Sequence, residues 1–151
     1  MSDPWRDLRF LIGAWETDGQ TQLGNGKGHF SFSLELDAHV VVRRSRTQYA
    51  DTPQRPAFSH QELTIIAADG DGLQATYFDS EGHVIRYRVD ATADGCVWTS
   101  EPVAGARFRM SYRPVNGNEV DARFEIAPPG GEFATYVESR ARRAGTDGRE
   151  R

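Results

Sequence analysis

The chain has 151 residues, of which 26% are charged and 38% hydrophobic, a length and composition typical of one folded domain. Its 18 basic and 22 acidic residues leave a formal charge of −4, which argues against nucleic-acid binding because that affinity depends on neutralising phosphates. The mean hydropathy is −0.62, and no apolar run approaches the roughly 20 residues of a membrane helix, so we expect a cytoplasmic protein without a membrane partner. The single cysteine, Cys96, excludes an internal disulfide and a cysteine-based zinc site.

The first predicted element is one short helix. Asp3 suits the capping position and Pro4 suits the first helical position. Trp5, Leu8 and either Leu11 or Ile12 then fall on one apolar stripe. We expect this helix to plug or flank one end of the domain.

Beyond the helix, short segments of alternating or apolar character recur about every ten residues, separated by turn-forming residues. The alternation is clearest over residues 27–36, where Phe30, Phe32 and Leu34 oppose polar neighbours. The sequence Asp-Gly-Asp-Gly at 69–72 is typical of a hairpin turn. The predicted strands are residues 14–20, 27–36, 39–49, 58–68, 73–79, 83–92, 96–101, 107–113, 119–127 and 133–142.

Tight turns between sequential strands make neighbours antiparallel, so these strands predict a meander. An open meander of about ten strands would leave two free edges, and closing the sheet removes both. We therefore predict an all-β fold, a closed antiparallel up-and-down barrel over residues 1–144, followed by a flexible tail at 145–151. The alternative is a sandwich of two sheets, for which only the loop at 51–57 offers a long crossover. Arg140, Arg142 and Arg143, just before the tail, are expected to form a solvated strand end.

For two of the predicted strands, the sequence does not decide which face points into the barrel. Over residues 39–49, one of Arg43 and Arg44 could point inward to bind an anionic group, although two solvated arginines are the more ordinary arrangement. Over residues 58–68, His60 and Glu62 share one face, either inside the barrel as a base with its carboxylate partner or outside as a surface pair. The candidate ligand-binding residues combine these groups with the large side chains predicted to face inward: Phe32, Arg43, His60, Glu62, Tyr87, Phe108, Met110, Tyr112 and Phe124.

Several motifs resemble the calycin superfamily. The run at residues 10–16, with Gly13 and Trp15, resembles the junction between helix and first strand in that superfamily. The runs at 28–44 and 77–84 look like those of bacterial lipocalin-like proteins of unknown function, of the DUF1579 and nitrobindin-like type. The resemblance covers most of residues 8–142 and implies a closed antiparallel barrel.

The same resemblance bears on haem. Nitrobindin-like proteins bind haem through a histidine near the final strand, and this chain has no histidine after His83. Haem binding is therefore disfavoured, with His39 and His60 as the remaining candidate iron ligands. We expect no cofactor and no metal.

Three functions suit a barrel of this size. The first is a protein that binds one small apolar or amphipathic ligand in a central cavity. The second is a barrel enzyme, an isomerase or cyclase, in which His60 with Glu62 or a tyrosine moves a proton. The third is an interaction module with a filled interior that pairs into a homodimer. The familiar catalytic motifs are missing from the sequence, so ligand binding is the favoured hypothesis. Trp15 is expected to close the barrel floor, and Cys96 is expected to be an inert buried thiol.

Overall fold

The computed structural model describes residues 3–21, 24–70 and 72–145. Ten antiparallel strands close into one barrel in up-and-down order, and β1 pairs with β10 to complete the circle. The predicted fold class is therefore confirmed. The strands are β1 (Gly13–Thr21), β2 (Gly24–Glu35), β3 (Val40–Tyr49), β4 (Phe58–Asp69), β5 (Gly72–Asp79), β6 (Val84–Thr92), β7 (Gly95–Ser100), β8 (Arg107–Asn116), β9 (Glu119–Ala127) and β10 (Ala134–Arg143).

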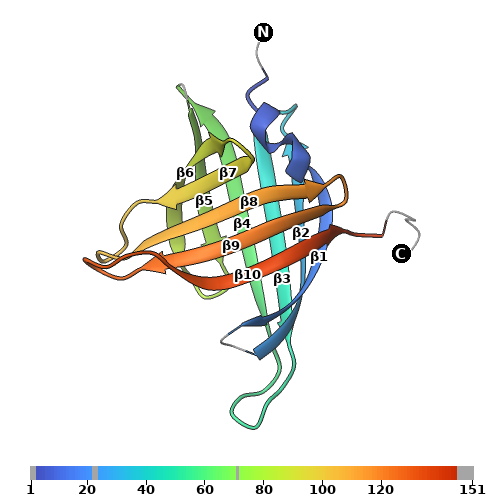
Figure 1. Cartoon of the computed structure of the whole chain (residues 1–151), viewed down its shortest axis with the longest axis vertical. Coiled ribbons are helices and arrows are strands. Elements are labelled where there is room, and N and C mark those ends of the chain that lie inside the picture. The colour runs from blue at the N-terminus through green and yellow to red at the C-terminus, as the bar shows by residue number, and fades with distance from the viewer. Residues whose placement is uncertain (1–2, 22–23, 71, 146–151) are drawn as a thin grey trace.

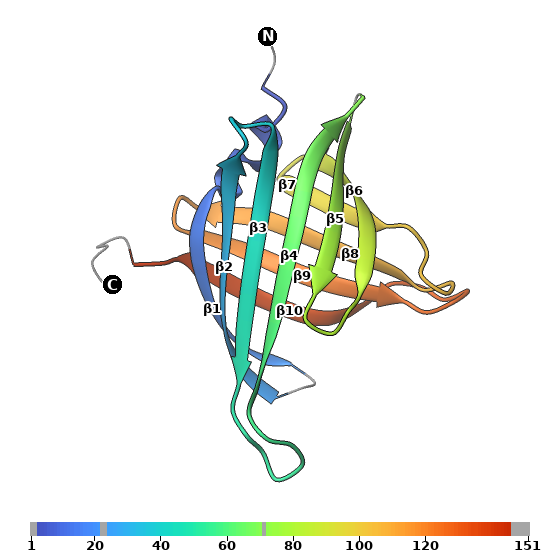
Figure 2. The ribbon, with the colours of Figure 1, turned by 180° about the vertical axis from the view of Figure 1, so that it is seen from behind.

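The barrel is flattened, so that two walls cross each other. Strands β2 to β5 run along the long axis of the molecule, and β8 to β10 cross in front of them (Figure 1). The view from behind shows the same crossing with β2 to β5 nearest the viewer (Figure 2). The loop at 51–57 joins β3 to β4, which pair directly as a hairpin, so the crossover that a sandwich would need is absent. Of the predicted tail, residues 146–151 lie outside the described residues.

The predicted helix is a short 3-10 helix, η1 (Arg6–Leu11), at one end of the barrel. Trp5, Leu8 and Leu11 are spaced by three residues, and a helix of three residues per turn places them on one side. All three are buried, and the Trp5 indole N–H donates to the Ala38 carbonyl at 2.8 Å. Asp3 does not cap η1, because its carboxylate accepts the backbone N–H of Trp5, ahead of the helix. The helix thus plugs one mouth of the barrel. Within the described residues, no helix is long and apolar enough to cross a membrane.

A cluster of aromatic rings fills the barrel next to η1. Trp15 stacks on Phe30 with ring centroids 6.2 Å apart, and the Trp15 indole N–H donates to the Leu11 carbonyl at 2.9 Å. Phe32 lies edge-on to Trp98 at 6.2 Å and to Tyr112 at 5.7 Å. Burying a ring of this size contributes about 1.5–3 kcal/mol of stability. The predicted role of Trp15 in closing the floor is confirmed.

Two further side chains define this end. Cys96 is buried, and burial raises the pKa of its thiol to about 11, so it stays protonated and inert as predicted. Arg143 does not follow the prediction of a solvated strand end. Its guanidinium lies 4.4 Å from the Trp15 ring and donates to the carbonyls of Ile12 and Phe10 at 2.9 and 3.3 Å. The last strand is therefore tied to the helix end.

Candidate functional site

Burial and strand register show which side chains of β3 and β4 point into the barrel, a question that the sequence did not decide. Thr64 and Ile66 on β4 are buried in the core, and side chains two residues apart share a face, so His60 and Glu62 also point into the barrel. On β3, Arg43 is buried and pairs with Thr64, whereas Arg44 is exposed on the outer face. The sequence favoured a surface position for all four groups. That prediction is confirmed for Arg44 and is wrong for Arg43, His60 and Glu62.

Arg43 and Glu62 form an ion pair inside the barrel. Arg43 Nη1 lies 2.7 Å from Glu62 Oε1, and the guanidinium carbon lies 5.3 Å from the centre of the Phe30 ring. Burial by itself would raise the pKa of Glu62, but the charge of Arg43 and the hydrogen bonds from His60 and Arg43 outweigh it and hold that pKa at about 2. Both groups are therefore charged at neutral pH. The buried Nε of Arg43 has no hydrogen-bond partner among the described residues.

His60 continues this network toward the rim of the barrel. Its Nε2 lies 3.0 Å from Glu62 Oε2, and its Nδ1 lies 3.5 Å from Glu81 Oε2. The hydrogen bond with Glu62 raises the pKa of His60, and the carboxylates of Glu62, Glu81 and Asp79 add to that rise against the effect of burial. Both ring nitrogens thus face carboxylates.

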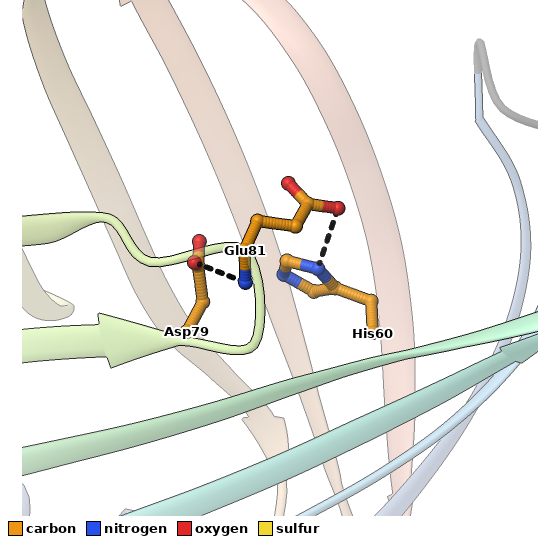
Figure 3. Close-up of side chains that lie close together, drawn as sticks. All are labelled: His60, Asp79 and Glu81. Atoms are coloured by element: carbon orange, nitrogen blue, oxygen red, sulfur yellow. Dashed lines mark hydrogen bonds and ion pairs between the residues drawn. The ribbon is translucent and has the colours of Figure 1, made fainter.

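Besides Glu81, a further carboxylate lies at the turn between β5 and β6, that of Asp79 at the end of β5. Neither residue is among the candidates predicted from the sequence. Oδ1 of Asp79 accepts the backbone N–H groups of Glu81 and His83 at 2.9 and 3.0 Å. Oδ2 of Asp79 accepts the Tyr77 hydroxyl at 2.9 Å and lies 2.9 Å from His83 Nδ1. Burial raises the pKa of Asp79, but these hydrogen bonds outweigh it and bring the pKa to about 2. Figure 3 shows His60 of β4 facing this turn.

A signal for this turn was present in the sequence. Asp79 stands directly before Ser80-Glu81-Gly82, and an aspartate at the start of a turn commonly accepts the backbone N–H two residues on. Its meaning depends on the register that pairs Glu62 with Asp79 across β4 and β5. That register is a tertiary fact, and the segments taken singly do not give it.

Three tyrosines surround the network. Burial raises the pKa of Tyr77, Tyr87 and Tyr112, so their hydroxyls stay protonated at neutral pH. The rings of Tyr77 and Tyr87 are 6.5 Å apart, edge to face, and Tyr87 lies 6.2 Å from Trp98. Tyr87 and Tyr112 are buried, whereas Tyr77 is partly exposed. The tyrosines therefore link the filled end of the barrel to the charged network.

The remaining candidates lie on the crossing strands. Phe108 and Phe124 stack with centroids 6.0 Å apart, and Met110 is the register partner of Phe124. All three side chains point inward, because each lies an even number of residues from buried Tyr112 or Val120 on its own strand. They nevertheless stay partly exposed. They come from β8 and β9, whereas Arg43, His60 and Glu62 come from β3 and β4. The nine predicted residues thus form three groups. The polar group lies on β3 and β4, and the partly exposed apolar group lies on β8 and β9. The third group, Phe32, Tyr87 and Tyr112, lies in the packed core.

A hollow of about 590 Å³ lies against strands β1 to β5. Two rows of outward side chains flank it, one with Ser31, Arg44 and Leu63 and the other with His29, Arg46 and Gln61. The residues between these rows, such as Phe30 and Glu62, send their side chains inward, so their backbone forms the floor. This hollow therefore lies on the outer face of the sheet, separate from the interior network.

The histidines do not fit a haem site. His39 lies in the turn after β2 with its ring 2.8 Å from the Leu36 carbonyl, outside the barrel network. Each ring nitrogen of His60 faces a carboxylate, so the wide macrocycle would have to displace Glu81 or Glu62 to reach it. That haem is disfavoured stays a prediction from the sequence.

No protein-family model matches the sequence, and no curated protein matches it. Among solved structures, one match is a de novo designed, fluorescence-activating beta barrel. It shares 14% identity with this chain, covers 95% of this chain and 99% of its own length, and has a TM-score of 0.48. A likeness at this level adds nothing to the barrel topology described above.

Proposed function

We propose that the protein is a small-molecule-binding barrel of the lipocalin-like, calycin type, which holds one apolar or amphipathic ligand in the open part of its interior. The observation that carries the proposal is the uneven burial of inward-facing side chains. Phe32, Trp98 and Tyr112 are almost fully buried, whereas Phe108 and Met110 point inward and still remain partly exposed. Apolar surface left accessible inside a barrel is typical of a ligand site, because covering it is favourable.

The polar network supports an amphipathic ligand. A buried donor without a partner costs free energy, and Arg43 Nε is such a donor among the described residues. A ligand oxygen that accepts from Arg43 Nε would remove this cost while the apolar body lies against Phe108, Met110 and Phe124. This binding needs no cofactor, nucleic acid or membrane. We place the protein in the cytoplasm. Measuring its mass in solution tests whether it pairs into a homodimer.

The test uses 8-anilinonaphthalene-1-sulfonate, an aromatic dye that carries one anionic group. We expect saturable fluorescence enhancement with the wild-type protein. Met110→Trp adds bulk on the inward face and should weaken dye binding by more than about tenfold, because a misfit of even one methylene in an apolar pocket changes binding by about 1–3 kcal/mol. Phe78→Ala is the matched control, because Phe78 is exposed beside the outer hollow.

Two results would contradict the proposal. One is a wild-type protein that binds no dye and that, purified from its own host, shows no retained ligand by native mass spectrometry. The other is dye binding that survives Met110→Trp and is lost in Phe78→Ala, since this pattern would place the site in the outer hollow.

Proton-transfer catalysis is a second candidate, favoured by the 3.0 Å contact between His60 Nε2 and Glu62 Oε2 inside the barrel. It predicts that a ligand recovered from the host changes chemically when incubated with the wild-type protein. The same ligand should stay unchanged with His60→Gln. Unchanged ligand with both proteins would leave binding as the function.

A further inference from the structure

We propose that His60, Asp79 and Glu81 form a binding site for a divalent metal ion of the zinc class at the rim of the barrel. One ligand atom from each residue lies within 4.8 Å of the others. His60 comes from β4, whereas Asp79 ends β5 and Glu81 lies in the turn that follows (Figure 3). This site goes beyond the proposed ligand binding and does not depend on it.

The hydrogen bonds of His60 fix which of its nitrogens is available. Glu62 is an ionised carboxylate paired with Arg43, so it can only accept. The Nε2 of His60, 3.0 Å from Glu62, must therefore carry the proton of the neutral ring. The lone pair of Nδ1 is then directed at Glu81 Oε2, 3.5 Å away. Two acceptors that face each other repel unless a proton or a metal ion lies between them.

The distance between these acceptors fits a metal ion. Zinc binds histidine nitrogen and carboxylate oxygen at about 2.0–2.2 Å, and a tetrahedral arrangement then separates two ligand atoms by roughly 3.4 Å. The observed separation of Nδ1 and Oε2 is 3.5 Å. Glu62, behind His60, occupies the place of the outer carboxylate that orients metal-binding histidines in many proteins.

Asp79 needs one adjustment to take part. Its two oxygens already have five contacts, of which two are with His83 Nδ1. The side chain of His83 is 62% exposed, so its ring can swing away and free a lone pair on Oδ2. The fourth metal position is then open to His83 or to water. A set of one imidazole and two carboxylates favours zinc or cobalt over magnesium and calcium, which prefer oxygen ligands alone.

The experiment titrates the purified full chain with Co²⁺ and follows visible absorption, and then displaces the Co²⁺ with Zn²⁺. We expect one saturable site with the intense bands of low-symmetry coordination. Glu81 is 54% exposed, so Glu81→Gln should fold normally and bind Co²⁺ more than about tenfold more weakly, since even outer partners of metal ligands are worth about 10- to 100-fold. His60→Gln should show a larger loss. Far-ultraviolet circular dichroism verifies the fold of each variant.

His29→Gln is the matched control, because it also removes one histidine, and that histidine is exposed on the outer face. The control should bind like the wild type. The proposal is overturned if the wild type shows no saturable Co²⁺ site, in which case His60 holds a proton between the carboxylates. It is also overturned if Glu81→Gln and His60→Gln bind as tightly as His29→Gln, or if Mg²⁺ displaces Co²⁺ as readily as Zn²⁺ does.

Discussion

Two adjacent arginines on β3 have opposite environments. Arg43 is buried against aromatic rings and paired with Glu62, whereas Arg44 is exposed beside the outer hollow. Their chemistry is the same, so position on the pleated strand alone separates a structural charge from a solvated one. A buried charge is tolerated only when it is paired, and removing its partner is therefore more costly than removing the whole pair.

The first prediction concerns this pair. Glu62→Gln leaves the Arg43 guanidinium buried without a counter-charge, so we expect the free energy of unfolding to fall by about 2–4 kcal/mol. The double variant Arg43→Met with Glu62→Gln should recover more than half of that loss. Urea denaturation measures both. Glu81→Gln, at an exposed position, is the control and should change stability by less than about 0.5 kcal/mol. A loss below about 1 kcal/mol for Glu62→Gln would contradict the prediction.

The second prediction concerns acid sensitivity. Arg109 donates to both carboxylate oxygens of Glu125, at 2.8 and 3.1 Å, and these hydrogen bonds lower the pKa of Glu125 below its ordinary value of 4.5. The folded state therefore binds this proton less tightly than the unfolded state. The resulting stability is present above about pH 4.5 and is lost as the pH falls below it.

The measurement is urea denaturation of Glu125→Gln and the wild type between pH 3 and 7. The wild type should lose more stability below about pH 4.5 than the variant, because the variant has no carboxylate to protonate there. Glu138→Gln, which removes an exposed carboxylate 3.4 Å from Arg123, should keep the wild-type slope. Parallel curves for Glu125→Gln and the wild type would show that Glu125 adds nothing to acid sensitivity.

At the scale of elements, the closure of the barrel depends on contacts at its seam. Strands β1 and β10 pair over a short register from Trp15 with Arg143 to Thr17 with Ala141. Arg143 reinforces this seam, because its guanidinium donates to the carbonyls of Phe10, Ile12 and Gly117. One side chain thus connects η1, the β8–β9 turn and the last strand.

The third prediction follows from that seam. Arg143→Lys keeps the charge but loses the planar group that reaches three carbonyls, so we expect a loss of about 1–3 kcal/mol of stability. Amide hydrogen exchange should speed up in β1 and β10 before the other strands. Arg142→Lys, at the neighbouring exposed position, should leave both measurements unchanged. Uniform acceleration over all strands would show that the seam does not open first.

At the scale of the whole molecule, side chains at the η1 end of the barrel are almost fully buried, whereas inward-facing side chains of β8 and β9 stay partly exposed. Trp15, Phe30 and Phe32 belong to one buried cluster with the apolar side chains of η1. Phe108 and Phe124 point inward but stay partly exposed. The proposed ligand site depends on this difference in burial.

The fourth prediction compares these two regions. Phe32→Ala removes a ring that is 1% exposed from a packed cluster, and such truncations cost about 3–5 kcal/mol. Phe108→Ala removes a partly exposed ring and should cost about half as much, because less apolar area is lost from contact. Urea denaturation of the two variants gives both values. Equal losses would mean that the interior is packed evenly and has no open part.

Prediction from the sequence succeeded where local pattern carries the information. The alternation of Phe30, Phe32 and Leu34 predicted β2, and the Asp-Gly turn predicted the hairpin between β4 and β5. Prediction stayed undecided at Arg43 and His60, because a strand with polar residues on both faces has no apolar side to fix its orientation. It gave the turn after Asp79 but missed the part that Asp79 and Glu81 play in the site, because only the pairing of Glu62 with Asp79 shows that these side chains meet His60.

The amino-acid sequence by itself determined the number and order of the strands, their antiparallel pairing and the closure of the sheet. Strand order and pairing arise from alternation and turn residues, which act between neighbours along the chain, and closure follows because an open sheet would leave two free edges. Only the tertiary structure decided that Arg43, Glu62 and His60 lie inside and meet the Asp79 turn. The physical reason is that a charge is stable inside a barrel only with its partners. These partners lie on three successive strands, and the register between the strands decides which residues face one another.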